Sequence, residues 1–198
     1  MKNLTQAAGG GVPMPKHICP WWVGYFLMNP LRRFAHNPRK TLGAYVSPGM
    51  TVLELGPGRG FFTIDLARLV GPTGRIIAVD IQPRMLKAVE RRASKEGLLE
   101  RVELRLGGND ASWAEGLTGK VDFALAFFVM HEVPDVPGYC RLIKNALVGG
   151  GRLFVAEPKM HVSACDYAGT VEAARQAGFE IVGHPKVRRG RATVFRKN

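Results

Sequence analysis

Apolar runs and amphipathic segments alternate along most of the chain. Apolar runs bounded by glycine or proline predict strands at Thr51–Leu55, Arg75–Ile81, Arg101–Leu106, Val121–Val129, Arg152–Glu157, Phe179–Gly183 and Ala192–Phe195. Apolar residues at helical spacing predict helices at Phe61–Val70, Pro83–Glu96, Tyr139–Ala146 and Val171–Ala177, and the glycines at 149–151 should end the third of these. This alternation predicts an α/β fold with a doubly wound, mostly parallel seven-stranded sheet and an antiparallel C-terminal hairpin.

The segment before the first predicted strand has a different character. Residues 1–15 contain three consecutive glycines and read as a flexible lead-in, whereas residues 16–48 are rich in aromatic side chains and are expected to be helical. Asn37 and Pro38 are typical of a helix start, and the sequence at 47–49, Ser-Pro-Gly, is typical of a helix end. We expect a single domain in which residues 16–48 form a lid or cap over a catalytic core at 49–198.

Charge and cysteine content narrow the classes of partner. The formal net charge of +12 favours contact with an anion, which can be a nucleic acid, an acidic lipid surface or a small molecule. Cys19, Cys140 and Cys165 are far apart and form no CxxC pair, so we expect no metal site and reduced thiols, as in the cytoplasm. We also expect no transmembrane segment, because no apolar stretch approaches the roughly 18–20 residues of a membrane span.

A glycine-rich turn follows the first predicted strand, with the sequence Glu54-Leu55-Gly56-Pro57-Gly58-Arg59-Gly60. Glycines there let a ligand pass close to the backbone, although a tight turn without a ligand has the same pattern. Asp80 ends the second strand, where a carboxylate can accept both ribose hydroxyls of a nucleoside. Nicotinamide-binding folds space their glycines as GxGxxG, whereas here an acid precedes GxGxG, which suits a ligand with a cationic amine.

With these residues in place, the sequence resembles the class I S-adenosylmethionine-dependent methyltransferases. The resemblance runs from about Leu42 to the C-terminus. Its further carriers are Ala78-Val79-Asp80, Gly108-Asn109-Asp110-Ala111, Val121-Asp122-Phe123-Ala124-Leu125-Ala126 and Leu147-Val148-Gly149-Gly150-Gly151-Arg152-Leu153. The segment His131-Glu132-Val133-Pro134-Asp135 is similar to the small free-standing type 11 members, akin to quinone-biosynthesis methyltransferases.

The resemblance implies S-adenosylmethionine as cofactor and assigns residues to each of its parts. The methionine part would lie on the glycine turn, with its amino group near Glu54, and the ribose would bind Asp80. The implied cofactor-binding set is Glu54, Gly56, Pro57, Gly58, Gly60, Asp80, Ile81, Gln82, Asn109, Asp110, Ala111, Phe127 and Phe128. Alternatives remain for some of these residues. Asp110 can instead be a helix cap, with Asn109 taking its role, and the two phenylalanines can simply pack in the core.

The sequence offers fewer candidate residues for the methyl acceptor than for the cofactor. His131 follows the fourth predicted strand, where a neutral histidine can take a proton from the acceptor, although it can also cap the following loop. Glu157 and His161 lie near the same rim, beyond the fifth strand. The aromatic residues Trp21, Trp22, Tyr25 and Phe26 either wrap an apolar acceptor or pack on the core.

The expected function is in-line transfer of a methyl group to a small-molecule acceptor. Phe127-Phe128-Val129-Met130 replaces the Asn/Asp-Pro-Pro-aromatic segment of enzymes that methylate exocyclic amines, and it contains no nucleophilic cysteine. Dispersed cysteines disfavour arsenite as acceptor. The competing readings are an RNA methyltransferase, or a basic, non-catalytic methyltransferase-like module that binds RNA or protein. The sequence leaves the acceptor and the oligomeric state open.

Overall fold

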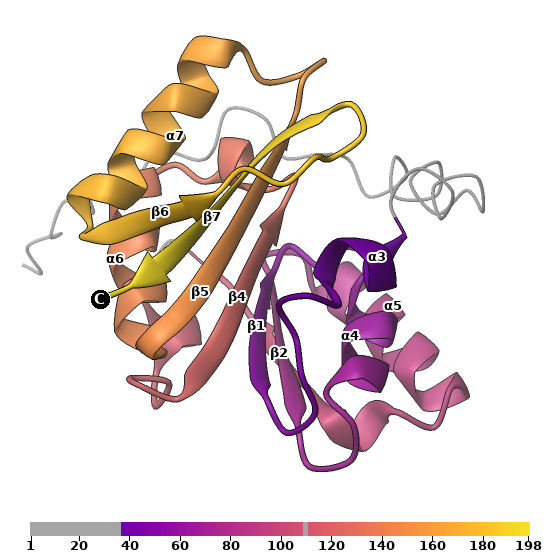
Figure 1. Ribbon diagram of the computed structural model, residues 1–198. Coiled ribbons are helices and arrows are strands. Elements are labelled where there is room, and N and C mark those ends of the chain that lie inside the picture. Colours follow the sequence, from indigo (N-terminus) through magenta and orange to yellow (C-terminus); the bar gives the residue numbers. More distant parts are fainter. Residues whose placement is uncertain (1–36, 109–110) are drawn as a thin grey trace, which may run out of the picture.

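The computed structural model describes residues 37–108 and 111–198, which form one seven-stranded sheet with helices on both faces (Figure 1). The strands are β1 (Thr51–Leu55), β2 (Arg75–Asp80), β3 (Val102–Leu106), β4 (Val121–Phe127), β5 (Leu147–Pro158), β6 (Phe179–Gly183) and β7 (Gly190–Lys197). Their order is β3-β2-β1-β4-β5-β7-β6. Strands β1 to β5 pair in parallel, and β7 is antiparallel to both β5 and β6. The predicted mostly parallel sheet with an antiparallel hairpin is confirmed.

Two separate layers of helices bury the two faces of the sheet. One layer contains α3 (Pro38–Leu42), α4 (Thr63–Leu69) and α5 (Pro83–Lys95), and the other contains α6 (Val136–Ala146) and α7 (Ala164–Gln176) (Figure 1). Short 3₁₀ turns lie at η1 (Leu99–Arg101), η2 (Ser112–Ala114) and η3 (Met130–Glu132). The continuous burial of β1, β2 and β4 follows from this double cover, because neither face of these strands meets water.

Several boundaries differ from the sequence prediction. Strand β4 ends at Phe127 instead of Val129, because Phe128 adopts a left-handed backbone with φ 63° while its N–H still donates to the Ala156 carbonyl at 2.8 Å. Strand β5 begins at Leu147, so the three glycines at 149–151 lie in an irregular part of the strand and do not end a helix. Helix α3 starts as expected, with Asn37 accepting from the Lys40 N–H, but it ends at Leu42.

The strand order reverses between β1 and β4, and this reversal positions the site. The connection from β1 leads outward to β2 and β3, whereas the connection from β4 leads the other way to β5. Loops leaving β1 and β4 therefore diverge to opposite faces and leave a crevice at the carboxyl ends of the two strands. The glycine turn follows β1, and the segment from Phe128 to His131 follows β4, so both border this crevice.

The central position of β1 makes its apolar side chains the most sensitive part of the fold. Leu53 is fully buried, whereas Leu106 at the end of β3 is 56% exposed. We expect Leu53→Ala to lower the free energy of unfolding by about 2–5 kcal/mol, the usual cost of a cavity in a packed core. The same substitution at Leu106 should change it by no more than about 0.5 kcal/mol. Urea denaturation of the ligand-free variants measures both, and equal losses would contradict the assignment of β1 to the core.

Candidate active site

The glycine turn after β1 is a left-handed loop held from several sides. Gly56, Gly58 and Gly60 have φ values of 62°, 55° and 79°, which side-chain-bearing residues rarely adopt. A Cβ on Gly56 would lie 2.5 Å from a methyl group of Val129, whereas a Cβ on Gly58 would meet no atom of residues 37–108 or 111–198 within 4 Å. Arg92 of α5 donates to the Gly60 carbonyl at 2.9 Å. The turn is therefore fixed, with open space over Gly58.

Asp80 lies at the end of β2, beside this turn. One carboxylate oxygen accepts from the Gln82 N–H at 2.9 Å and the other from the Gly58 N–H at 3.3 Å. Burial raises the pKa of Asp80 to about 6, although these backbone hydrogen bonds act in the opposite direction. Each oxygen keeps acceptor capacity beyond its one backbone donor, so the carboxylate can also accept hydroxyl groups of a ligand.

Glu54 is a buried carboxylate in the middle of the sheet. Its Oε2 atom has no hydrogen-bond partner among the described residues. Burial raises its pKa to about 7, the nearby Thr63 hydroxyl lowers it, and the neighbouring charge of Asp80 raises it further. A buried polar atom without a partner costs free energy, which a ligand with a hydrogen-bond donor or a positive charge would recover.

A histidine–glutamate pair lies on the other side of the crevice. His131 belongs to η3, just beyond β4, and its Nδ1 atom lies 2.5 Å from Oε2 of Glu157, which is fully buried near the end of β5. The His131 backbone N–H also donates to Oε1 of Glu157 at 3.3 Å. The hydrogen bond that the His131 ring donates to Glu157 raises the pKa of His131, burial lowers it, and the charges of Glu157 and Glu132 raise it.

The polar cluster continues on the α7 face of the sheet. The hydroxyl groups of Tyr167 and Thr193 lie 2.7 Å apart, and Nδ1 of His184 lies 3.2 Å from the same threonine oxygen. Burial raises the pKa of Tyr167, the Thr193 hydrogen bond lowers it, and the charge of Glu157 raises it. Sequence reasoning missed these residues because α7, β6 and β7 meet only in the folded sheet. It also missed Thr63 and Arg92.

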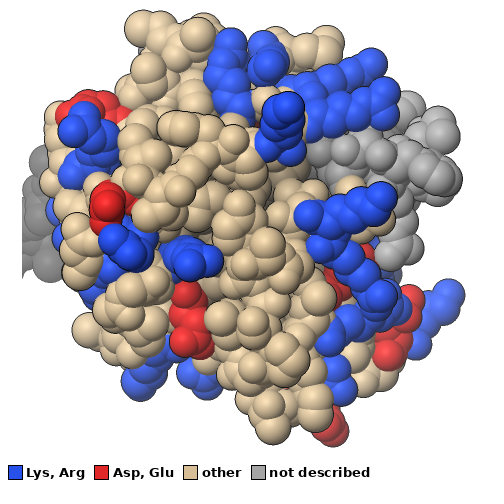
Figure 2. Space-filling view, in the orientation of Figure 1, with Lys and Arg blue, Asp and Glu red and all other residues tan. Residues whose placement is uncertain are grey.

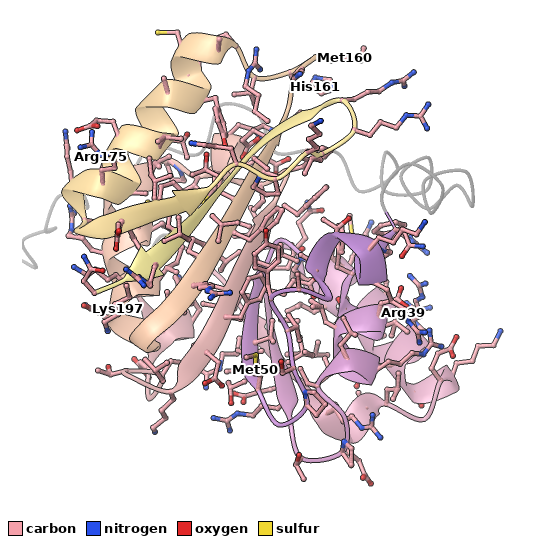
Figure 3. All side chains as sticks on the ribbon, viewed as in Figure 1. Arg39, Met50, Met160, His161, Arg175 and Lys197 are labelled. Atoms are coloured by element: carbon pink, nitrogen blue, oxygen red, sulfur yellow. The ribbon has the colours of Figure 1, made fainter. Side chains whose placement is uncertain are left out.

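Three further residues that the sequence analysis predicted for the site lie in different environments. The Phe127 ring is buried against Phe62, at a centroid distance of 4.5 Å, so it is part of the core beneath the crevice. Phe128 packs over Gly190. His161 lies with Met160 on the exposed turn after β5 (Figure 3).

Other predicted residues keep their status as predictions. Ile81 and Gln82 follow Asp80 directly, and Ala111 precedes η2. Six predicted residues lie outside the described part of the chain: Trp21, Trp22, Tyr25, Phe26, Asn109 and Asp110.

The described residues, 37–108 and 111–198, contain neither a metal-binding cluster nor a membrane-spanning helix. Within these ranges no three His, Cys, Asp or Glu side chains group closely enough to hold a metal ion. In the same ranges no helix has the length and apolar character needed to cross a membrane.

Comparison with known proteins identifies the family. Residues 46–185 match the methyltransferase domain family, and the chain belongs to it. A crystal structure of an S-adenosylmethionine-dependent methyltransferase from Aquifex aeolicus has the same fold, with a TM-score of 0.79 and 22% identity, covering 90% of this chain and 98% of that one. S-adenosylmethionine is accordingly the cofactor of this methyltransferase.

Curated relatives are similar over parts of their length. The ubiquinone biosynthesis O-methyltransferase of Methylocella silvestris is 32% identical over 152 residues, which is 76% of this chain and 57% of the relative. The arsenite methyltransferase of Halobacterium salinarum is 44% identical over 64 residues, which is 32% of this chain and 16% of the relative. The chain thus spans less than two thirds of the length of these relatives.

The residues of the crevice fit the cofactor chemically. Its cationic amine suits the unpartnered oxygen of Glu54, and its ribose hydroxyls suit the spare acceptor capacity of Asp80. Among the described residues the space over Gly58 is open, which leaves room for the methionine part of the cofactor to pass across the turn. The assignment of individual residues to parts of the cofactor nevertheless stays a prediction, and two experiments follow from it.

Substitution of Asp80 tests the ribose assignment. We expect Asp80→Ala to weaken binding of S-adenosylhomocysteine by roughly 1.5–3 kcal/mol, the usual value of hydrogen bonds to a charged group. Titration calorimetry measures the dissociation constant, and circular dichroism checks that the variant is folded. Glu180→Ala is a matched control, because Glu180 forms an exposed ion pair with Arg196 on the β6–β7 hairpin. An unchanged dissociation constant in folded Asp80→Ala would place the ribose elsewhere.

The raised pKa of Glu54 predicts a pH dependence of cofactor binding. A ligand ammonium group favours the ionised carboxylate, so binding at pH 6.5 should release a proton, and affinity should rise as the pH approaches 7. Without ligand, the protonated side chain contributes stability that is complete below pH 4.5 and is lost as the pH rises through about 7.

Calorimetry in two buffers of different ionisation enthalpy measures the proton release, and Glu54→Gln should reduce it. Asp80 contributes the remaining release through its own raised pKa of about 6. Proton uptake on binding, or release that Glu54→Gln leaves intact, would exclude Glu54 as the amine partner.

Proposed function

We propose that this protein transfers the methyl group of S-adenosylmethionine to an oxygen or nitrogen atom of a small-molecule acceptor. The observation that carries the proposal is the His131–Glu157 pair beside the crevice that ends β1 and β4. A histidine held by a buried carboxylate suits an acceptor that must lose a proton as it is methylated. The proposal retains two expectations from the sequence, a cap formed by residues 16–48 and a cytoplasmic location.

The chain's own residues have three tasks in this reaction. The bound cofactor supplies a methyl group that is already activated by its positively charged sulfur, so a strong nucleophile on the protein is unnecessary. Glu54, Asp80 and the glycine turn fix the position of this group. Phe128 and the residues after β4 exclude water and align the acceptor atom, which is the proximity contribution to the rate.

His131 receives the proton that the acceptor loses. Its Nδ1 atom faces Glu157, so the Nδ1–H form of the neutral ring is favoured and Nε2 keeps its lone pair. The Nε2 atom lies 4.0 Å from an oxygen of Glu132, and 30% of the side chain is exposed. When the acceptor is methylated, its proton would pass to Nε2, and Glu157 would stabilise the resulting imidazolium charge.

Relatives support a small acceptor. Their names describe methylation in ubiquinone biosynthesis and methylation of arsenite. Of the two cysteines in the described residues, Cys140 is buried and Cys165 is exposed at the start of α7, so the described part of the chain offers no thiol pair for arsenite. A protic oxygen or nitrogen acceptor is therefore the better match to the residues of this crevice.

The pH dependence of the reaction tests the role of the pair. Because Glu157 raises the pKa of His131, the rate should rise with pH through an inflection above 6.5, as the ring becomes neutral. Glu157→Gln should move the inflection to lower pH, and Glu132→Gln should move it less. Replacing the base itself, in His131→Gln, should lower kcat by about 10²–10⁴-fold.

Two measurements make this test possible before the acceptor is known. NMR titration of the imidazole signals gives the His131 pKa in each variant. Labelled cofactor incubated with fractionated cell extract reveals an acceptor. Binding of S-adenosylhomocysteine without transfer to any fraction would favour the non-catalytic module. An inflection that is the same in Glu157→Gln and in the unmodified protein would exclude the pair as the proton acceptor.

A further inference from the structure

Positive charge is concentrated where β5 ends and β7 begins. We define the basic rim as Lys159, Lys186, Arg188, Arg189 and Arg191, which come from the turn after β5 and from the β6–β7 hairpin. Residues 158–165 and 181–198 contain no Asp or Glu. Figure 2 shows Lys and Arg side chains gathered over this end of the molecule. The carboxylate nearest to the rim in sequence, Glu157, is buried and bound to His131.

The rim has a fixed relation to the His131–Glu157 pair. In the antiparallel pairing of β5 with β7, Glu157 lies opposite Arg191, and Pro158 lies opposite Gly190. The Lys159 N–H donates to the Arg189 carbonyl at 2.9 Å, which extends the pairing by one step. The Arg191 side chain donates to the Val162 carbonyl at 3.0 Å. The rim cations are therefore attached to the same strand ends that carry Glu157, the partner of the proposed proton acceptor His131.

Two residues with a strained backbone also lie at the basic rim, next to Gly190. In the described ranges, Phe128 and Arg189 are the two residues other than glycine with a positive φ, at 63° and 56°. Both adjoin Gly190, because Arg189 precedes it and a Cβ there would lie 3.2 Å from the Phe128 ring. Strained residues of this kind gather at binding and catalytic sites, where the surrounding structure holds them in place. This observation is independent of charge and selects the same hairpin.

We propose that the methyl acceptor carries an anionic group, a phosphate or a carboxylate, which the basic rim binds while the acceptor atom lies beside His131. This inference rests on the proposed function and adds a substrate class to it. The rim spans one hairpin turn and one strand end, which suits a single anionic group better than the repeated charges of a nucleic acid. Arginine and lysine together can hold such a group by charge-assisted hydrogen bonds.

Binding of three small probes tests the proposal on the full chain saturated with S-adenosylhomocysteine. Phenyl phosphate, benzoate and benzyl alcohol share a ring and differ in charge. We expect at least one of the two anions to bind at least tenfold more tightly than the alcohol, with NMR shifts at the Gly190 and Ala192 amides. The tighter anion identifies phosphate or carboxylate as the recognised group.

Paired double variants separate the rim from net charge. Lys186→Gln with Arg188→Gln should weaken anion binding at least tenfold. Arg75→Gln with Lys120→Gln removes the same charge from exposed positions at the starts of β2 and β4, and should leave binding unchanged. Circular dichroism confirms that both double variants are folded.

Three results would overturn the inference. These are equal losses in the two double variants, anions that bind no better than benzyl alcohol, and rim-dependent binding of a 20-nucleotide RNA or of phosphatidylglycerol vesicles without binding of the small anions. The His131 titration in the same samples keeps the two proposals distinct. If Glu157→Gln shifts that titration as expected while the anions fail to bind, only the anionic acceptor is excluded.

Discussion

Pairing of β1 with β4 is the constraint on which the other features of this protein depend. The two strands are parallel neighbours, yet the connections that follow them lead in opposite directions. The two loops therefore leave the crevice open between the carboxyl ends of the strands. The glycine turn and the 3₁₀ turn that carries His131 are the first segments after these two strands. The hydrogen bonds of the sheet thus bring the chemistry of both sides of the crevice together, and the two segments also meet where Val129 packs against Gly56.

The two sides of the crevice differ in how their acids are balanced. On the side of β1 and β2, Glu54 and Asp80 are buried close enough for the charge of Asp80 to raise the pKa of Glu54 further. The described part of the chain supplies no cation for the free Glu54 oxygen. On the side of β4 and β5, Glu157 is equally buried but has His131 as its partner. The side formed by β1 and β2 therefore suits a ligand that brings positive charge, whereas the carboxylate on the side of β4 and β5 already has a partner in His131.

Much of this arrangement is predictable from the sequence, and the exceptions have physical reasons. Alternating apolar runs predict the strands and their mostly parallel order, which the structure confirms, and the glycine turn with Asp80 predicts a cofactor half of the site, which stays a prediction. Sequence periodicity could not reveal that Phe128 ends β4 in a left-handed conformation, because local propensity disfavours it, and the packing around Gly190 and the hydrogen bond to Ala156 that hold it arise only in the folded sheet. It also gave Glu157 no more weight than His161, since a separation of 26 positions between residues 131 and 157 hides a contact that the β4–β5 register creates.

The insertion of β7 between β5 and β6 has a consequence for the order in which the protein is built. A ribosome delivers β6 before β7, yet among the described strands β6 pairs with β7 alone. Until β7 emerges, β6 has no place in the sheet, and the outer edge of β5 has unpaired backbone groups. The strands that carry Glu54 and Asp80 can assemble earlier, whereas the basic rim arises only when the β6–β7 hairpin closes. Late synthesis thus coincides with the part of the molecule that we propose to select the substrate.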